Sequence, residues 1–168
     1  MVNHFSIFNI VFYEFISSTF LTYCVIIYGG TTTFPGVFVT IIGMFVAFLW
    51  SARFSGTYLN PALVIACMIK KERSVPLIKG IVLILVEFLG ALAGTFIAWG
   101  IAAELPIPFQ TNTNAHEAAL VFTREVIGTF LYITIVLILV SSDTTFVEME
   151  IQVWLTMPLI LVTICEMI

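Results

Sequence analysis

The chain is dominated by long apolar stretches that are separated by short segments rich in Gly, Pro and Thr. A helix needs about 20 residues to cross the roughly 30 Å hydrocarbon core of a bilayer. Five stretches reach or approach that length, and they predict membrane-spanning helices at residues 5–28, 36–52, 75–102, 118–142 and 151–168. The pattern therefore predicts an all-α membrane protein.

One further apolar stretch, at residues 61–69, is too short to span a bilayer, because about nine helical residues cover only about 14 Å. Asn60 is suited to cap the start of this helix and Pro61 to its first turn, and Lys70 begins the basic segment that ends it. Irregular backbone within a bilayer is tolerated only where it is buried in protein or lines a cavity. We interpret the segment as a re-entrant half-helix beside a pore, with an interfacial or a short core helix as the alternatives.

The composition supports a membrane protein and argues against a soluble protein, a nucleic-acid-binding protein or an enzyme. Hydrophobic residues make up 61% of the chain and charged residues 10%, whereas a soluble domain is about a quarter charged. The net charge of −4 includes no basic patch, so we expect no nucleic-acid partner. Cys24, Cys67 and Cys165 fit no metal or redox spacing, and His4 and His116 belong to no catalytic set. We expect no metal, no cofactor and no enzymatic activity.

The basic residues indicate the orientation of the spans. Four of the six lie close together, at Lys70, Lys71, Arg73 and Lys79. Short loops rich in Lys and Arg stay on the cytoplasmic side. If the half-helix returns to the side from which it came, the N-terminus of this multi-pass chain is cytoplasmic.

The first and fourth spans share a short pattern. Residues 14–21 and 125–131 both contain Glu, an apolar residue and Ile, followed by Thr-Phe-Leu with one residue of slack. The copies begin three spans apart and so enter the membrane from opposite sides, which is typical of an inverted repeat, although chance similarity between two apolar helices is an alternative. This predicts a single domain with a first repeat at about residues 5–102 and an incomplete second repeat at about 118–168.

The repeat also predicts where a second half-helix would start. Asn60 lies 46 positions after Glu14, and the same offset from Glu125 points to position 171, beyond the 168 residues of this sequence. We expect the sequence to be truncated before that second half-helix and the span that follows it.

The stretch Ser55-Gly56-Thr57-Tyr58-Leu59-Asn60-Pro61-Ala62 resembles the first signature of the major intrinsic protein family, the aquaporins and aquaglyceroporins. That signature reads Ser-Gly-Ala-His-Leu-Asn-Pro-Ala, and six of eight positions agree. The Glu-Phe pair at Glu14 is similar to the family's first span. The segment from Glu87 to Gly94 resembles its third, where Gln is more usual than Glu87. The resemblance implies an aquaporin-like helical bundle with one re-entrant half-helix and about five of six spans present.

The resemblance also assigns roles. Asn60 would donate its side-chain amide to a passing oxygen, while Pro61 and Ala62 begin the half-helix. Tyr58 stands where His is usual, and its ring would either narrow the pore or turn into packing. Counting back from Asn60, the filter position of the second span is Thr40, and its small side chain indicates a wider filter. Support of the re-entrant loops is assigned to Glu14, Glu125 and Gly56.

The function implied is a channel for passive passage of water or small neutral solutes such as glycerol through a lipid bilayer. The family also implies a homotetramer. The alternative is a shortened, non-conducting membrane subunit with a structural or regulatory role, or a product without function. A third reading is that two chains combine their half-pores, which needs opposite orientations in one membrane.

Overall fold

The structure is a computed structural model that describes residues 6–28, 34–70, 75–102 and 115–139. Five helices form within these ranges: α1 (Ile7–Tyr28), α2 (Phe34–Phe54), α3 (Pro61–Ile69), α4 (Leu77–Ala102) and α5 (Ala115–Leu139). The all-α fold class is confirmed, and α3 has the bounds that the sequence predicted. The predicted span at 151–168, with Cys165, lies outside the described residues.

Three of these helices contain stretches long and apolar enough to cross a membrane, namely Ile7–Ile27, Leu77–Ile101 and Ala118–Ile138. The apolar stretch of α2, Gly36–Ala52, is shorter. The helix itself is 21 residues long, because it starts two residues before Gly36 and continues to Phe54. Pro35 does not prevent this early start, since proline is tolerated in the first turn of a helix.

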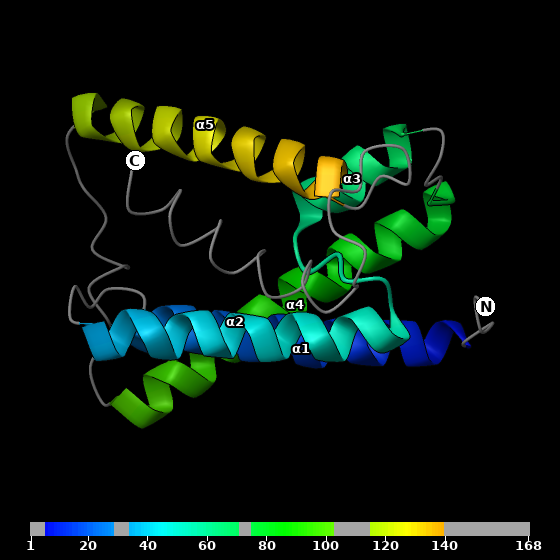
Figure 1. Cartoon of the computed structure of the whole chain (residues 1–168), viewed down its shortest axis with the longest axis horizontal. Helices are drawn as coiled ribbons and strands as arrows, with labels where there is room; N and C mark the ends of the chain where they lie inside the picture. The colour runs from blue at the N-terminus through cyan, green and yellow to red at the C-terminus, as the bar shows by residue number, and fades with distance from the viewer. Residues whose placement is uncertain (1–5, 29–33, 71–74, 103–114, 140–168) are drawn as a thin grey trace. The chain divides into compact units, whose positions relative to one another are not determined.

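The chain forms two compact units, Met1–Pro106 and Ile107–Ile168. In the first unit, α1 packs along both α2 and α4, and α3 packs on α4 (Figure 1). The described part of the second unit is α5, whose first turns carry mostly exposed side chains, including Arg124 and Glu125. The division of the chain into two repeats stays a prediction.

Small residues set the crossing of α1 and α4. A Cβ atom at Gly90 would lie 2.8 Å from the carbonyl oxygen of Phe15, and one at Gly94 would collide with the carbonyl oxygen of Thr19. Such spacing brings two helix backbones together in membrane proteins. Because the later glycine meets the later part of α1, the two helices run in the same direction.

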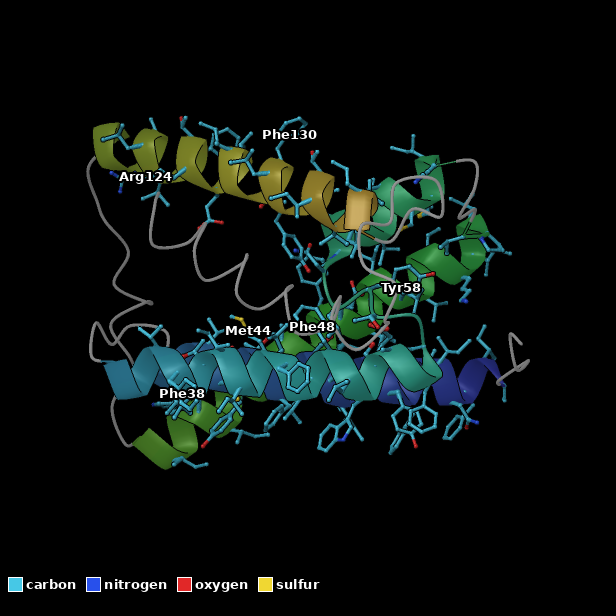
Figure 2. The ribbon with its side chains drawn as sticks, in the orientation of Figure 1. Phe38, Met44, Phe48, Tyr58, Arg124 and Phe130 are labelled. Atoms are coloured by element: carbon cyan, nitrogen blue, oxygen red, sulfur yellow. The ribbon has the colours of Figure 1, made fainter. Side chains whose placement is uncertain are left out.

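Helix α2 has one buried side that faces its unit. The buried positions recur at helical spacing: Thr40, Gly43, Met44, Ala47, Phe48 and Ser51. Figure 2 shows Met44 and Phe48 on the opposite side of α2 from Phe38, which is 52% exposed. The buried side ends in Ser51, and the chain then turns toward α3.

Candidate re-entrant loop and half-helix

The loop between α2 and α3, residues 55–60, is held by one buried carboxylate. Glu14 of α1 is fully buried. Its Oε1 accepts a hydrogen bond from the backbone amide of Tyr58 at 3.2 Å, and its Oε2 accepts one from Leu59 at 3.0 Å. A charged acceptor makes each of these bonds stronger than a neutral one would. The carboxylate thereby fixes the backbone immediately before Asn60.

Two serines complete the contacts of this carboxylate. The Ser51 hydroxyl donates to Oε1 of Glu14 at 2.7 Å, and the Ser55 hydroxyl donates to the same oxygen. The two serines are one helical turn apart at the end of α2, and their hydroxyl oxygens lie 2.7 Å from each other. With the two backbone amides, Glu14 has four donors, which is what a carboxylate in a low-dielectric interior requires.

Glu14 is the residue that the family resemblance predicts as a support of the loop, whereas it assigns no role to either serine. Ser51 lies 37 residues after Glu14 and Ser55 lies 41 residues after it. The available signal was their spacing of four, which places both hydroxyls on one face at the end of a predicted helix. We name Glu14, Ser51 and Ser55 together the carboxylate clamp.

Aromatic packing lies next to the clamp. The rings of Tyr13 and Phe54 stack with centroids 3.9 Å apart and planes at 9° to each other. Tyr13 precedes Glu14 and Phe54 precedes Ser55, so the stack joins α1 to the end of α2 beside the hydrogen bonds. Stacked rings add about 0.5–1.5 kcal/mol to their area burial.

The loop backbone is strained. Gly56 has φ +106°, Thr57 φ +61° and Leu59 φ +48°, and the left-handed region is uncommon for residues other than glycine. Such residues cost about 1–3 kcal/mol each and persist only where their surroundings over-determine them. The hydrogen bonds from the backbone amides of Tyr58 and Leu59 to Glu14 of the clamp hold the loop in this conformation.

Tyr58 belongs to the same loop (Figure 2). A Cβ atom at Gly56 would lie 3.3 Å from Cε2 of the Tyr58 ring, so the ring leans over this glycine. The ring is half-buried. Of the two alternatives that the sequence left open, this local contact favours packing against the loop.

Asn60 connects the strained loop to α3. Its backbone is extended (φ −150°, ψ 118°), and its Oδ1 accepts a hydrogen bond from the amide of Ala62 at 2.9 Å. Its carbonyl oxygen accepts from Leu63 and Val64 and so begins the helical ladder. With Oδ1 occupied, the side-chain nitrogen is the remaining polar group, and it makes no hydrogen bond within the described part of the chain.

The other predicted site residues lie at different places. Pro61 and Ala62 form the first turn of α3 and are half-buried. Thr40 is buried on α2 and donates its hydroxyl to the Gly36 carbonyl oxygen at 3.0 Å. It lies eleven residues before Ser51, which corresponds to about 16 Å along the helix axis. Glu125 is exposed on α5 in the second unit, where the described residues provide it with no hydrogen bond.

Comparison with known proteins indicates the family and the fold of the chain. Residues 1–167 match the sequence model of the family described as major intrinsic protein. No curated protein matches the chain. Among solved structures, the chain is similar to the X-ray structure of the aquaglyceroporin from Plasmodium falciparum, with a TM-score of 0.72 and 20% sequence identity. The match covers 95% of this chain and 72% of that one. At this identity, the likeness demonstrates a shared fold.

Proposed function

Because this chain belongs to the major intrinsic protein family, whose members are membrane channels for water and small solutes, we propose that it forms such a passage. In this proposal, water or a small neutral solute such as glycerol crosses the bilayer passively past Asn60. The N-terminus of α3 stands at the middle of the passage. The chain acts without catalysis or cofactor.

The main support for the proposal is the hydrogen bonding of the Asn60 side chain. Its oxygen is used by the Ala62 amide, so its nitrogen is the group left to donate. A solute that leaves bulk water needs replacement hydrogen bonds, and an amide N–H provides one to any neutral oxygen. The carboxylate clamp holds the preceding backbone, so this donor stands in a fixed position.

The direction of α3 makes the proposed passage selective against cations. The N-terminal end of a helix carries a partial positive charge of roughly half an elementary charge. In α3 this end lies at Asn60 and Pro61, while Lys70 is at the opposite end. Such a field disfavours cations and protons near Asn60 and leaves neutral solutes unaffected.

The remaining assignments are part of the same proposal. Thr40 lines a filter wide enough for glycerol, Tyr58 and Gly56 shape the loop, and Glu125 supports a second loop as Glu14 supports the first. The N-terminus and the basic residues around Lys70 are cytoplasmic. The assembled channel is a homotetramer in which each chain has its own passage.

A complete passage of this type uses two opposed half-helices, and the described residues contain one, α3. Permeability tests the proposal directly. The protein is purified and reconstituted into liposomes, and swelling is followed by stopped-flow light scattering in an osmotic gradient and in a glycerol gradient.

The informative variant is Asn60→Asp. Aspartate caps a helix as well as asparagine does, so α3 keeps its first turn, but the N–H donor is lost. One hydrogen bond is worth about 0.5–1.5 kcal/mol, so we expect water permeability to fall about two- to tenfold. Asn9→Asp is the matched control, because it makes the same chemical change in the first turns of α1.

We expect swelling faster than in empty liposomes, slowed by Asn60→Asp and unchanged by Asn9→Asp. If the reconstituted protein leaves swelling at the rate of empty liposomes, the channel proposal is wrong and the alternative of a non-conducting membrane subunit replaces it. If the two variants behave alike, Asn60 is not the donor.

A further inference from the structure

The first unit contains a second buried acid, Glu87, at the middle of α4. It is 2% exposed, and Glu14 is fully buried. The side of α4 that carries it is otherwise small or apolar: Gly80, Leu83, Gly90, Gly94 and Ala98. Ionisable residues within membrane spans are costly and mark functional positions.

The neighbours of Glu87 follow from the contacts on either side of it. At Gly80, two turns before it, α4 meets Met68 of α3, and at Gly90, one turn after it, α4 meets Phe15 and Ser18 of α1. Glu87 therefore lies between the half-helix and α1. Ser18 lies one turn after Glu14 and Gly90 about one turn after Glu87, so on these parallel helices the two acids stand at the same level. The Glu14 charge and the backbone amide of Asn60 both act on the Glu87 carboxyl.

The two acids differ in their hydrogen bonds. Glu14 accepts from four donors, two hydroxyls and two backbone amides. Neither oxygen of Glu87 has a partner within hydrogen-bond geometry among the described residues. A buried carboxylate without donors is strongly unfavourable, whereas a neutral carboxyl in the same place is much less costly.

Electrostatics does not allow both acids to be charged in this interior. Two like charges that share a buried site repel strongly at low dielectric, and one of the two carboxyls then keeps its proton. Among the described residues, the four donors that make hydrogen bonds with either acid all make them with Glu14. The negative charge is therefore stabilised there, and Glu87 is left to hold the proton.

We propose that Glu87 is a neutral acid that positions Asn60, so that the pair Glu14 and Glu87 carries one negative charge. A protonated carboxyl has a carbonyl oxygen that can accept the Asn60 amide, and an O–H group that can donate. Glutamine has the same two functions in the same shape. The role assigned to Asn60 rests on the proposed function, but the charge state of Glu87 does not.

Infrared spectroscopy of the purified full chain at neutral pH tests this without any transport measurement. A protonated carboxyl has a C=O stretch that a carboxylate and a glutamine lack. We expect this band in the wild-type protein, its loss in Glu87→Gln, and its retention in Glu14→Gln. No such band in the wild type, or a band removed by Glu14→Gln and kept in Glu87→Gln, overturns the proposal.

Hydrogen exchange of the same variants tests the positioning role. In Glu87→Gln we expect the thermal midpoint and the exchange rate of the Asn60 amide to stay at wild-type values, because the neutral isostere replaces a neutral acid. In Glu14→Gln, exchange of the Tyr58 and Leu59 amides should rise about tenfold or more, because the charged acceptor is gone.

Glu87→Leu separates packing from hydrogen bonding. Leucine fills a similar volume without an acceptor, so the Asn60 amide should lose protection while α4 keeps its own. Unchanged protection at Asn60 in Glu87→Leu contradicts the positioning role, as does a loss of stability in Glu87→Gln that equals the loss in Glu14→Gln. If the liposomes do not swell faster than empty ones, but the infrared band and the exchange rates are as expected, the proposed function is wrong and this inference still holds.

Discussion

The loop before α3 and the crossing of α1 with α4 are neighbouring parts of one unit, and they are stabilised in opposite ways. The loop depends on groups that are present, since the Glu14 carboxylate binds four donors at once. The crossing depends on groups that are absent, since Gly90 and Gly94 let the α1 backbone approach without a side chain between.

The difference follows from what each region has to hold. Packed helices already satisfy their backbone polar groups, so close contact between them needs only complementary shape. A loop with three residues at positive φ has backbone groups that no helix satisfies, so it needs a polar partner of the right charge and position. We therefore expect the loop to be destabilised when side-chain atoms are removed, and the helix crossing to be destabilised when side-chain atoms are added.

Removal at the clamp is expected to have the largest effect. Glu14→Ala leaves the two backbone amides without their acceptor, while the two serine hydroxyls keep each other and the Ser51 carbonyl oxygen as partners. Each buried group without a partner costs about 1–3 kcal/mol, and partial rearrangement toward water reduces the total, so we expect a loss of about 3–5 kcal/mol. The measurement is the free energy of unfolding from an SDS titration in mixed micelles, with hydrogen exchange to locate the change.

The loss should concentrate in the loop. Amides of Tyr58 and Leu59 should exchange much faster, while those in the middle of α4 should stay protected. A uniform rise in exchange across all helices would contradict the view that Glu14 acts on the loop.

Addition at the crossing should have the next largest effect. In Gly94→Ala, the new Cβ meets the Thr19 carbonyl oxygen, which is backbone and cannot move away without shifting α1. Overpacking of this kind costs about 1–3 kcal/mol. Gly100→Ala is the matched control on the same helix, because a Cβ there meets nothing within 4 Å.

Gly100→Ala should leave stability unchanged or raise it by up to about 1 kcal/mol, since alanine favours a helix more than glycine. The comparison is made by thermal unfolding of both variants in the same detergent. Equal midpoints for Gly94→Ala and Gly100→Ala would show that the close approach of α1 and α4 is not a constraint.

The smallest of these effects is expected at Gly56. Its φ of +106° is a backbone conformation that L-residues avoid, and a Cβ there would also press on the Tyr58 ring at 3.3 Å. We expect Gly56→Ala to cost about 1–2 kcal/mol. The double variant Gly56→Ala with Tyr58→Ala separates the two contributions in a double-mutant cycle, and a cost that disappears in the double variant would assign it to the ring and not to the backbone.

Much of this fold could be predicted from local pattern. The bounds of α3 follow from Asn60, Pro61 and Lys70, because capping and the start of a short helix are decided by adjacent residues. The start of α2 differs from the prediction, since the apolar pattern begins at Gly36 and the helix begins at Phe34. The residues Phe34, Pro35 and Gly36 are compatible with a helix that begins at either Phe34 or Gly36.

The site was only partly predictable. A glutamate inside an apolar span must have partners, and the sequence indicated Glu14 for that reason. It did not indicate which partners, because Ser51, Ser55, Tyr58 and Leu59 lie between 37 and 45 residues away along the chain. Glu87 stood out in the sequence as a departure from the usual Gln, but its nearness to Glu14 and Asn60 did not.

The sequence by itself thus determined the helices, the half-helix and its cap, because these depend on residues a few positions apart. The tertiary structure alone decided which acid receives the donors and which is left without them. Hydrogen bonding and charge repulsion act over a few ångströms in space, and only the packing of α1 against α2 and α4, and of α3 on α4, sets those distances.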